Sequence, residues 1–564
     1  MILDILKDKV QKAFIECGYE IEIRIIKSNR PDLCDYQCDD IFKISKMYHK
    51  NPIEVGEIIV DKINSYSDFS DYFDEVLFVK PGFINIKVSN KIINDTINKM
   101  IKDKHYNIPL KNSKTYFLDY GGPNVAKPLH VGHLRTAIIG ESIKRIINFM
   151  GHKTVCDVHL GDYGLQIGEV IYAILEDKLD INDITLEYLD ESYPKMSKLC
   201  KEDSELLEKC ALITKELQDG NLEYRKLWEK IREISVSDIK RMYDYLSISF
   251  DLWEGESDCY KYIDYVTEIL DKHNLLMDSQ GAKVIDVSKV DDNKEMPPLI
   301  YRKSNGAYLY GTTDMAAVYQ RVKLFNPNYI LYVTDARQGL HFEQVFRACD
   351  KAKITENVVL EHLGYGTVNG TDGKPFKTRS GDTVKLDDLF NQVKEVFINT
   401  KETNKDMSCE DLDILVNAII KFADLQNNRE KDYIFDIQKF SNVVGKTGPY
   451  ILYTYLRINK ILEQENLNIE ELDLSIYNNF DRDLRLKLLD LPIILNSAYN
   501  ERMPHYVAEY IYDICVLLNI FYQNNHVSTA LDDIKKEWLL LLTFTNRLLK
   551  DLLNLLVIDI PSKM

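Results

Sequence analysis

The fold is decided by residues 115–151, which read TYFLDYGGPNVAKPLHVGHLRTAIIGESIKRIINFMG. Their opening run, residues 115–120, is β-prone, and Gly121-Gly122-Pro123 ends it. From Leu134 onward the apolar residues recur at helical spacing until a glycine stops the pattern. This order predicts a strand, a loop and a helix, with His130-Val131-Gly132-His133 at the start of the helix.

The start of this helix has the chemistry of a phosphate site. Unpaired backbone N–H groups and the positive end of the helix dipole attract anions. Gly132 leaves room for a nucleotide to approach the backbone. His130 and His133 could donate hydrogen bonds to phosphate oxygens as charge builds on them. For the tetrapeptide alone, two surface histidines beside a turn explain the pattern equally well, so the surrounding residues decide.

The residues before the tetrapeptide carry a family resemblance. Residues 119–129, DYGGPNVAKPL, lead into HVGHLR, and together they resemble the signature of arginyl-tRNA synthetase, a class I aminoacyl-tRNA synthetase. The family usually has serines before Pro123, where this chain has Gly121 and Gly122. The resemblance implies ATP-dependent ligation of L-arginine to its cognate tRNA through an arginyl adenylate, for protein synthesis.

A second matching segment follows the next predicted strand, residues 153–160. It runs from His159 to Gln166 as HLGDYGLQ and is similar to the family's H-x-G-D-aromatic-G-x-Q. A strand–helix–strand unit of this length implies parallel strands with a right-handed crossover, and ligands at the carboxyl ends of the strands. Asp162 and Gln166 would order the site. The structural alternative makes the glycines turn residues and Gln166 a helix start.

Tyr310 and Asp314 are candidates for recognising arginine. Residues 299–303 and 307–310 predict a hairpin, after which the segment from Tyr310 to Asp314 opens a helix. Residues four apart on a helix face the same way, and a carboxylate beside a phenol suits a planar guanidinium. Asp314 could equally be a helix cap. The resemblance favours the substrate, because the family holds the arginine side chain with Y-x-x-x-D at this place.

Two later segments complete the match. Residues 335–342, DARQGLHF, follow a strand predicted at 329–334 and are similar to the family's D-x-x-Q-x-x-H-F, in which Gln338 would reach the amino acid. After another strand predicted at 358–365, residues 369–381, NGTDGKPFKTRSG, form a loop in which little can pack, so we expect it to be mobile.

The loop at 369–381 stands where the family has its KMSKS signature, in divergent form. Lys377 and Arg379 would neutralise charge on the leaving pyrophosphate. Family members that lack the usual second lysine have a lysine just ahead of the first signature, and Lys127 matches that position.

We expect a multidomain α/β chain with a Rossmann-like parallel-sheet catalytic core, an N-terminal α/β domain and a C-terminal all-α bundle. Residues 1–110 would be the N-terminal tRNA-contacting domain, 111–440 the catalytic domain and 441–564 the helical anticodon-binding domain. The region 170–280 reads as a helical insertion with no catalytic constellation. The plainer interpretation makes the first region a structural appendage and the last a bundle for oligomerisation.

In more detail, the first region predicts a helix over residues 2–17 and a strand over 20–26. Helices broken at Asn51-Pro52 and a hairpin turning at Pro81-Gly82 then follow. At the chain end, residues 441–461 and 506–556 carry long amphipathic patterns.

Composition narrows the function classes. At 564 residues the chain predicts two to four domains. The net charge of −18 argues against indiscriminate binding of nucleic acid, so a tRNA partner rests on the motifs. The ten cysteines include no C-x-x-C pair, which favours reduced thiols in a cytoplasmic protein over a metal site. We find neither a signal peptide nor a membrane-length apolar run.

The resemblance implies a set of site residues, with ATP as a substrate, Mg²⁺ accompanying ATP, and tRNA(Arg) as partner of a monomeric enzyme. Catalysis and ATP binding would fall to Lys127, His130, Gly132, His133, Lys377 and Arg379. Arginine would be held by Asp119, Gly122, Pro123, Asn124, His133, His159, Tyr310, Asp314 and Gln338. Two alternative functions remain. A small-molecule nucleotidyltransferase could share the motif but would not need the terminal regions. A paralogue that only binds its ligands could keep the domains, but the intact motifs argue against it.

Overall fold

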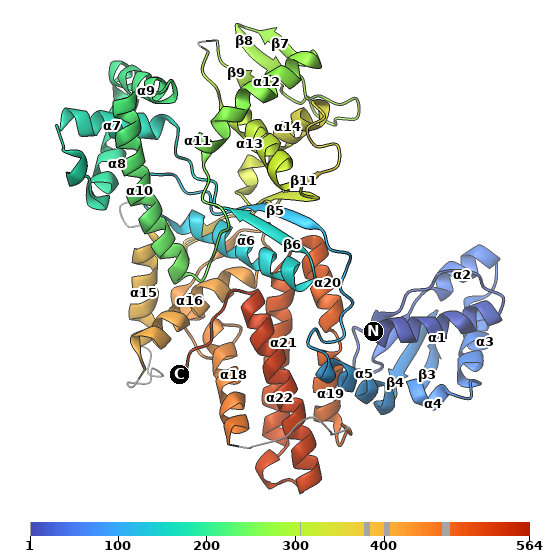
Figure 1. Cartoon of the computed structure of the whole chain (residues 1–564). Helices are drawn as coiled ribbons and strands as arrows, with labels where there is room; N and C mark the ends of the chain where they lie inside the picture. The colour runs from blue at the N-terminus through green and yellow to red at the C-terminus, as the bar shows by residue number, and fades with distance from the viewer. Residues whose placement is uncertain (1, 305, 377–383, 400–406, 465–473) are drawn as a thin grey trace. The chain divides into compact units, whose positions relative to one another are not determined.

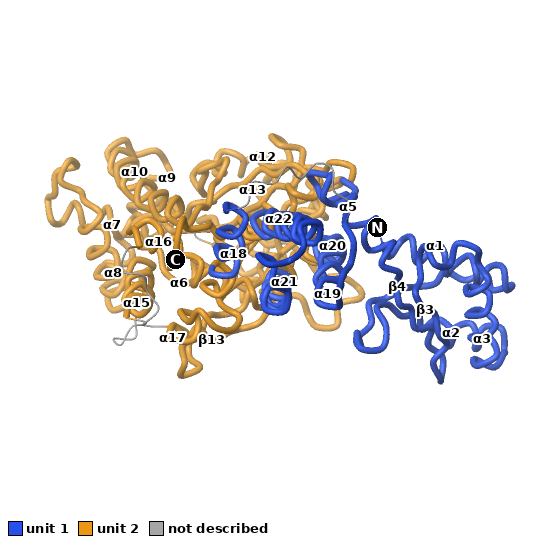
Figure 2. Tube along the Cα trace, turned by 90° about the horizontal axis from the view of Figure 1, so that it is seen from below, with its two compact units in different colours: residues 1–110, 453–496, 510–551 blue, residues 111–452, 497–509, 552–564 orange. Residues whose placement is uncertain are grey.

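The computed structural model describes residues 2–304, 306–376, 384–399, 407–464 and 474–564. The chain forms two compact units (Figure 2). Unit 1 comprises residues 1–110, 453–496 and 510–551, and unit 2 comprises residues 111–452, 497–509 and 552–564.

The amino-terminal part of unit 1 is an α/β module. An antiparallel sheet in the order β1-β2-β4-β3 is accompanied by helices, as the sequence predicts (Figure 1). Its elements are α1 (Ile2–Glu16), β1 (Ile26–Lys27), β2 (Tyr36–Cys38), α2 (Ile41–Tyr48), α3 (Pro52–Asn64), α4 (Phe69–Tyr72), β3 (Phe73–Val79), β4 (Phe83–Val88) and α5 (Asn90–Lys102).

The strand expected over residues 20–26 is wrong in extent, because only Ile26 and Lys27 join the sheet. The residues before them alternate between buried and exposed, yet side chains bind their backbone in place of a neighbouring strand. Gln11 donates to the carbonyl of Ile21 and accepts from the N–H of Ile23 at 2.9 Å. The pattern of apolar residues predicted the buried face correctly but not the hydrogen-bond partner.

The end of the chain is helical, as expected. Helix α19 lies wholly in unit 1, where it packs on α5, and the guanidinium of Arg482 donates to both carboxylate oxygens of Asp35 at 3.0 and 2.7 Å. The other helices each cross from one unit into the other. The pattern predicted from residue 441 becomes helical only at Gly448. The helices are α18 (Gly448–Glu463), α19 (Asn479–Leu488), α20 (Leu491–Glu501), α21 (His505–Asn524) and α22 (Asp532–Leu555).

Unit 2 contains the parallel sheet that the strand–helix–strand pattern predicted. Its order is β11-β10-β5-β6 and every neighbouring pair is parallel, with helix α6 packed on β5 and β6 (Figure 1). The elements of this core are β5 (Thr115–Asp119), α6 (Val131–Phe149), β6 (Lys153–Asp157), α13 (Tyr310–Phe325), β10 (Tyr329–Tyr332), α14 (Gly339–Lys351), β11 (Val359–His362), β12 (Val368–Asn369), α15 (Leu386–Ile398), α16 (Cys409–Leu425), β13 (Tyr433–Ile434) and α17 (Ile437–Phe440).

The region between β6 and α13 is largely helical, and it ends in a small antiparallel sheet, β7-β8-β9, of which β7 and β8 were not predicted. The second strand of the hairpin expected at 307–310 is also wrong: it is reduced to one bridge between Arg302 and Tyr308, and Tyr310 is already helical. The elements are α7 (Leu165–Glu176), α8 (Leu186–Glu202), α9 (Ser204–Gln218), α10 (Leu222–Tyr245), α11 (Glu256–Cys259), α12 (Ile263–Lys272), β7 (Leu276–Ser279), β8 (Ala282–Ile285) and β9 (Leu299–Arg302).

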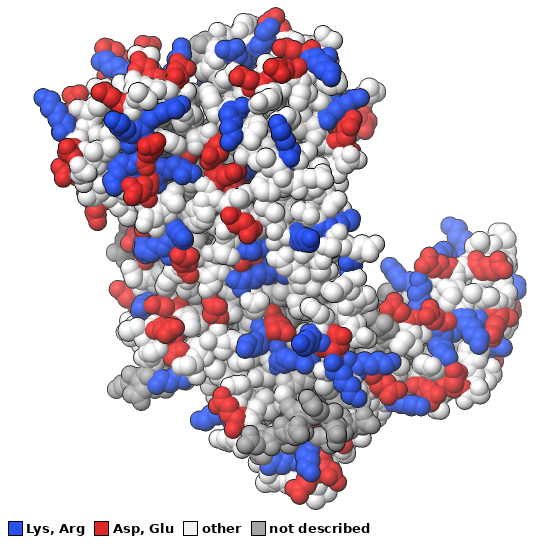
Figure 3. Space-filling model, in the orientation of Figure 1, with Lys and Arg blue, Asp and Glu red and all other residues white. Residues whose placement is uncertain are grey.

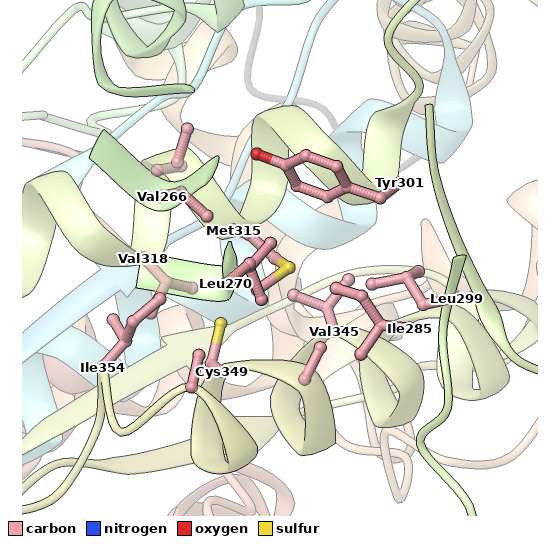
Figure 4. Packing of buried hydrophobic residues seen from close by; sticks show 14 of the residues in the cluster. Val266, Leu270, Ile285, Leu299, Tyr301, Met315, Val318, Val345, Cys349 and Ile354 are labelled. Atoms are coloured by element: carbon pink, nitrogen blue, oxygen red, sulfur yellow. The ribbon is translucent and has the colours of Figure 1, made fainter. Parts of the chain in front are cut away.

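A buried apolar cluster fixes α13 against the sheet. Met315 and Val318 of α13 lie among Leu270 of α12 and Val345 and Cys349 of α14 (Figure 4). Burying such side chains stabilises each by about 1.5–3 kcal/mol. The first turn of α13, which carries the predicted arginine-binding residues, is therefore held by its own helix on a packed core.

The surface mixes both signs of charge. Lysines and arginines are interspersed with acidic residues over the face in view (Figure 3). Among the residues that the structure describes, no helix is long and apolar enough to span a membrane.

Candidate active site

The carboxyl ends of β5 and β6 carry a buried charge network. Asp119 ends β5 and lies opposite Asp157, which ends β6. Arg321, from α13, places one guanidinium nitrogen 2.7 Å from a carboxylate oxygen of Asp119 and 3.2 Å from one of Asp157. A buried guanidinium between two carboxylates compensates their charge. Asp119, predicted as a second carboxylate for the substrate, therefore already pairs with a guanidinium of the chain itself.

His159 joins this network just beyond β6. It adopts a left-handed backbone conformation with φ of 44°, and its Nδ1 lies 3.4 Å from a carboxylate oxygen of Asp157. Burial opposes protonation, but the hydrogen bond to Asp157 and the charge of Asp119 raise the pKa of His159 to about 9. Asp157 and Asp119 thus favour the protonated form of His159, whereas Arg321, with a guanidinium nitrogen 3.2 Å from the same Nδ1, opposes it.

His130 and His133 sit where the sequence predicted, at the N-terminus of α6. His130 is the residue just before the helix, and its Nδ1 accepts the backbone N–H of Gly132 at 3.1 Å. The Nδ1 of His133 accepts the backbone N–H of His130 at 3.2 Å, and the two rings stack with centroids 3.9 Å apart. A Cβ at Gly132 would approach the His130 ring to 2.9 Å, so the glycine makes room for this imidazole.

The two rings are neutral hydrogen-bond donors. Burial, with the nearby charge of Lys127, lowers the pKa of His130. Burial also lowers the pKa of His133 well below its usual value, with His130 and Lys127 adding to the effect. Because each Nδ1 accepts a backbone N–H, each neutral ring carries its proton on Nε2. The helix start therefore offers two neutral N–H donors from its imidazoles, while the backbone amides of Val131 and Gly132 are engaged by Val384 and His130.

The loop before these histidines is held by backbone pairing. Gly122 has φ of +44° and donates its N–H to Val158 at 3.0 Å, while Pro123 accepts from the N–H of Gly161 at the same distance. Asn124 pairs with Gly161, where a Cβ would approach the Asn124 side chain to 2.3 Å. These backbone pairs and the close approach of Gly161 fix the position of Asn124.

Lys127 follows in the same loop and is half-buried. Its ammonium lies 4.5 Å from the ring centroid of Tyr193, a residue of the helical insertion.

Tyr310 and Asp314 occupy the first turn of α13, as predicted. Tyr310 is exposed, and Asp314 is partly buried with its carboxylate 2.5 Å from the Nε2 of His341 on α14. Although most of the Tyr310 side chain is exposed, partial desolvation of its phenol raises the pKa, and the charges of Glu256 and Asp314 add to this rise. Gln338 ends a short 3₁₀ helix, Ala336–Gln338, and its side chain is exposed.

Glu256 is a residue that the sequence analysis missed. It opens α11, which packs against α13, and its backbone N–H donates to Leu160 just beyond β6 at 3.0 Å. Burial raises the pKa of Glu256 to about 7; the charge of His159 opposes this rise, and the carboxylates of Asp162 and Asp314 add to it. The charge of Asp314 thus acts on Glu256, and the two carboxyls stand on the helices α13 and α11, which pack together.

Asp162, which the sequence analysis proposed to order the site, binds residues on two other segments. Its buried carboxylate accepts from Arg232 at 2.9 Å and from the N–H and hydroxyl of Ser257 at 3.0 and 2.8 Å. Gln166 donates to the carbonyl of Gly161 at 3.1 Å. Asp162 therefore fixes the residue next to Glu256.

Lys377 and Arg379 lie outside the described residues. The segment that follows them can be placed, because Val131 donates its N–H to the carbonyl of Val384 at 3.3 Å and Leu386 donates to that of Leu129 at 3.0 Å. Residues 384–386 thus run antiparallel to residues 129–131, beside His130.

Comparisons with known proteins agree along the whole chain. Residues 96–437 match the family model described as tRNA synthetases class I (R), catalytic domain; residues 451–564 match the DALR anticodon binding domain, and residues 1–88 the arginyl tRNA synthetase N terminal domain. The arginine–tRNA ligase of Alkaliphilus oremlandii is 39% identical over 98% of both chains, and that of Agathobacter rectalis is 38% identical over 100% of both.

A solved structure shows the same similarity at the level of the fold. The arginyl-tRNA synthetase of Plasmodium falciparum superposes with a TM-score of 0.81 at 28% identity, covering 100% of this chain and 99% of that one. The chain belongs to the arginyl-tRNA synthetase family.

Proposed function

We propose that this protein ligates L-arginine to tRNA(Arg) in two steps, with ATP as co-substrate. One observation carries the proposal: two complementary sites share one edge of the parallel sheet. His130 and His133 offer neutral donors at the N-terminus of α6, and Asp314 and Glu256 form an acidic pair on α13 and α11. The first suits phosphate and the second suits a guanidinium.

In the first step a carboxylate oxygen of arginine attacks the α-phosphorus of ATP. The bond between that phosphorus and the bridging oxygen breaks, and pyrophosphate leaves with the electron pair. In the second step a ribose hydroxyl at the end of the tRNA attacks the arginyl carbonyl, loses its proton, and AMP leaves. No covalent enzyme intermediate is needed, so positioning and charge stabilisation carry the catalysis.

The phosphate half of the site would work by hydrogen bonds that strengthen as charge develops. His130 and His133 would donate from Nε2 to the phosphates, and Gly132 would leave the backbone open to the nucleotide. Lys127 would neutralise charge on pyrophosphate. We assign the same role to Lys377 and Arg379 from the resemblance alone.

Magnesium fits this half of the site as a companion of ATP. The side chains at the helix start are imidazoles and an ammonium, which do not compete for a hard cation. Mg²⁺ would be held by phosphate oxygens and water, and would neutralise their charge when bound.

The arginine half would use the acidic pair. Asp314 and Glu256 would accept from the guanidinium, with the ring of Tyr310 beside it. Asn124 and Gln338 would bind the amino-acid end of the substrate. We assign Asp119 to holding α13 through Arg321 rather than to the substrate. The remaining arginine-binding proposals are Gly122, Pro123, His133 and His159.

Selectivity against lysine follows from the same pair. A planar guanidinium can donate to both carboxylates at once, whereas an ammonium is a point charge that leaves acceptors unpaired. Loss of such pairing discriminates by roughly 10⁴-fold or more in sites of this kind, so no editing step is required.

We also propose the finer assignments of domain and setting. Residues 1–110 would contact tRNA, residues 111–440 would carry out the chemistry with the helical insertion at about 170–280, and residues 441–564 would bind the anticodon. We propose a monomer in the cytoplasm, where its ten free thiols would stay reduced.

Arginine-dependent exchange of labelled pyrophosphate into ATP tests the proposal, run with and without tRNA. We expect exchange with arginine, at a lower rate in His130→Ala. Absence of exchange with arginine under both conditions would refute the assignment.

A further inference from the structure

We propose that Tyr193, in the helical insertion, is a positioning residue for adenylate formation, whose ring face holds the ammonium of Lys127 beside the phosphate site. The inference rests on the function proposed above. It gives a catalytic purpose to an insertion in which the sequence shows no catalytic pattern.

The contact between the two residues is specific. The Nζ of Lys127 lies 4.5 Å from the ring centroid of Tyr193 on α8, within the range of a cation–π interaction. Within the described part of the chain, Lys127 has neither an ion pair nor a side-chain hydrogen bond. The Tyr193 ring is therefore the side chain in direct contact with this ammonium, and the carboxyl of Glu169 interacts with its charge from farther away.

A second contact from the same turn of α8 supports the assignment. Asp190, three residues before Tyr193, accepts from the Nζ of Lys385 at 2.7 Å. Lys385 pairs antiparallel with His130. One turn of the insertion thus touches the chain ahead of His130, at Lys127, and the strand-like segment beside it, at Lys385.

The sequence of α8 allows this turn to reach outward. Pro194 stands inside the helix directly after Tyr193. Proline has no N–H to donate to the carbonyl of Asp190, and its ring crowds that carbonyl. The turn that contacts both lysines therefore lacks one backbone hydrogen bond of the helix.

The chemistry of the contact explains why an aromatic ring, and not a carboxylate, faces Lys127. A carboxylate at this place would pair with Lys127 and compete with the phosphates for its charge. A ring face attracts the cation electrostatically yet supplies no formal negative charge. Lys127 is therefore held near the site by a ring that adds no carboxylate to compete with pyrophosphate.

The test is a double-mutant cycle on the full-length protein, measured as arginine-dependent pyrophosphate exchange with tRNA present. Tyr193→Leu removes the ring and should lower kcat/KM for ATP by about 3- to 30-fold, the range of one partly desolvated cation–π contact. Tyr193→Phe keeps a ring face and should stay within about twofold of the parent. In a Lys127→Ala background, Tyr193→Leu should have no further effect, because its target is gone.

Tyr188→Leu provides a matched control. Tyr188 lies on the same helix, but its hydroxyl donates to Asp177 at 2.8 Å, so its loss should leave exchange unchanged. Equal losses from Tyr193→Leu with and without Lys127, or a loss in Tyr193→Phe as large as in Tyr193→Leu, would overturn the inference while leaving the proposed function intact. A parent-like Lys127→Ala would remove the role of Lys127 and the inference with it, whereas absent exchange in the parent would refute the function itself.

Discussion

Arginine binding should depend on pH through Glu256. Burial raises the pKa of this carboxyl to about 7 and the charge of His159 opposes the rise; Asp162 and Asp314 add to it. A guanidinium binds the ionised form. About one Glu256 in ten is ionised at pH 6 and about nine in ten at pH 8, so the KM for arginine should be about tenfold higher at pH 6. Because the raised pKa disfavours the carboxylate, binding weakens as pH falls.

Glu256→Gln isolates this effect. The amide cannot ionise, so the tenfold dependence should disappear from the KM profile. At pH 8 the variant loses a hydrogen bond to a charged group, about 1.5–3 kcal/mol, which raises KM about 10- to 150-fold. The contact between His341 and Asp314 is present in both proteins, so the difference between their profiles reports Glu256.

The assay is pyrophosphate exchange at saturating ATP, with arginine varied between pH 6 and pH 8. The pKa of His159, about 9, lies above this range. Parallel profiles for parent and Glu256→Gln, or an unchanged KM at pH 8, would refute the reasoning.

Three further changes have defined outcomes. Asp314→Ala should raise the KM for arginine by 100-fold or more, because losing one partner of a buried charged contact costs about 3–5 kcal/mol; an arginine titration like the parent's would contradict this. His130→Ala should lower the rate of adenylate formation more than ATP affinity, since its hydrogen bond strengthens in the transition state, and single-turnover kinetics would separate the two. Lys421 is fully buried, with Nζ donating to the carbonyl of Val557 at 2.8 Å, and burial lowers its pKa to about 7. The unfolded chain therefore binds the extra proton between about pH 7 and pH 10, so stability rises with pH there. Lys421→Met should melt higher than the parent at pH 7, and the gain should shrink by pH 9; an equal gain at both would count against the lysine's titration.

Sequence patterns within a single helix or loop predicted the site residues that lie on that same segment. His130 and His133 follow from a strand, a glycine-rich break and an amphipathic helix, and the structure places them at the N-terminus of α6. Tyr310 and Asp314 share the first turn of α13 because both stand in one helical repeat. The parallel sheet followed from the length of the crossover between β5 and β6.

Local patterns could not predict the roles of residues that depend on contacts between segments far apart in the sequence. Glu256 opens a helix of four residues, too short for any periodic pattern, and reaches the site because Asp162 binds the neighbouring Ser257. The sequence alone did not show that Asp119, proposed for the substrate, pairs with Arg321, far along the chain. Likewise, the partner of Lys127 stands on α8, in a region where the sequence indicated only a helical insertion without a catalytic pattern.

Aminoacylation of total tRNA with labelled arginine and, in parallel, labelled lysine tests the central claim most directly. The acidic pair on α13 and α11 predicts that arginine is esterified to tRNA and that lysine is at least about 10⁴-fold poorer in kcat/KM. Equal charging with both amino acids, or charging with neither, would contradict the account.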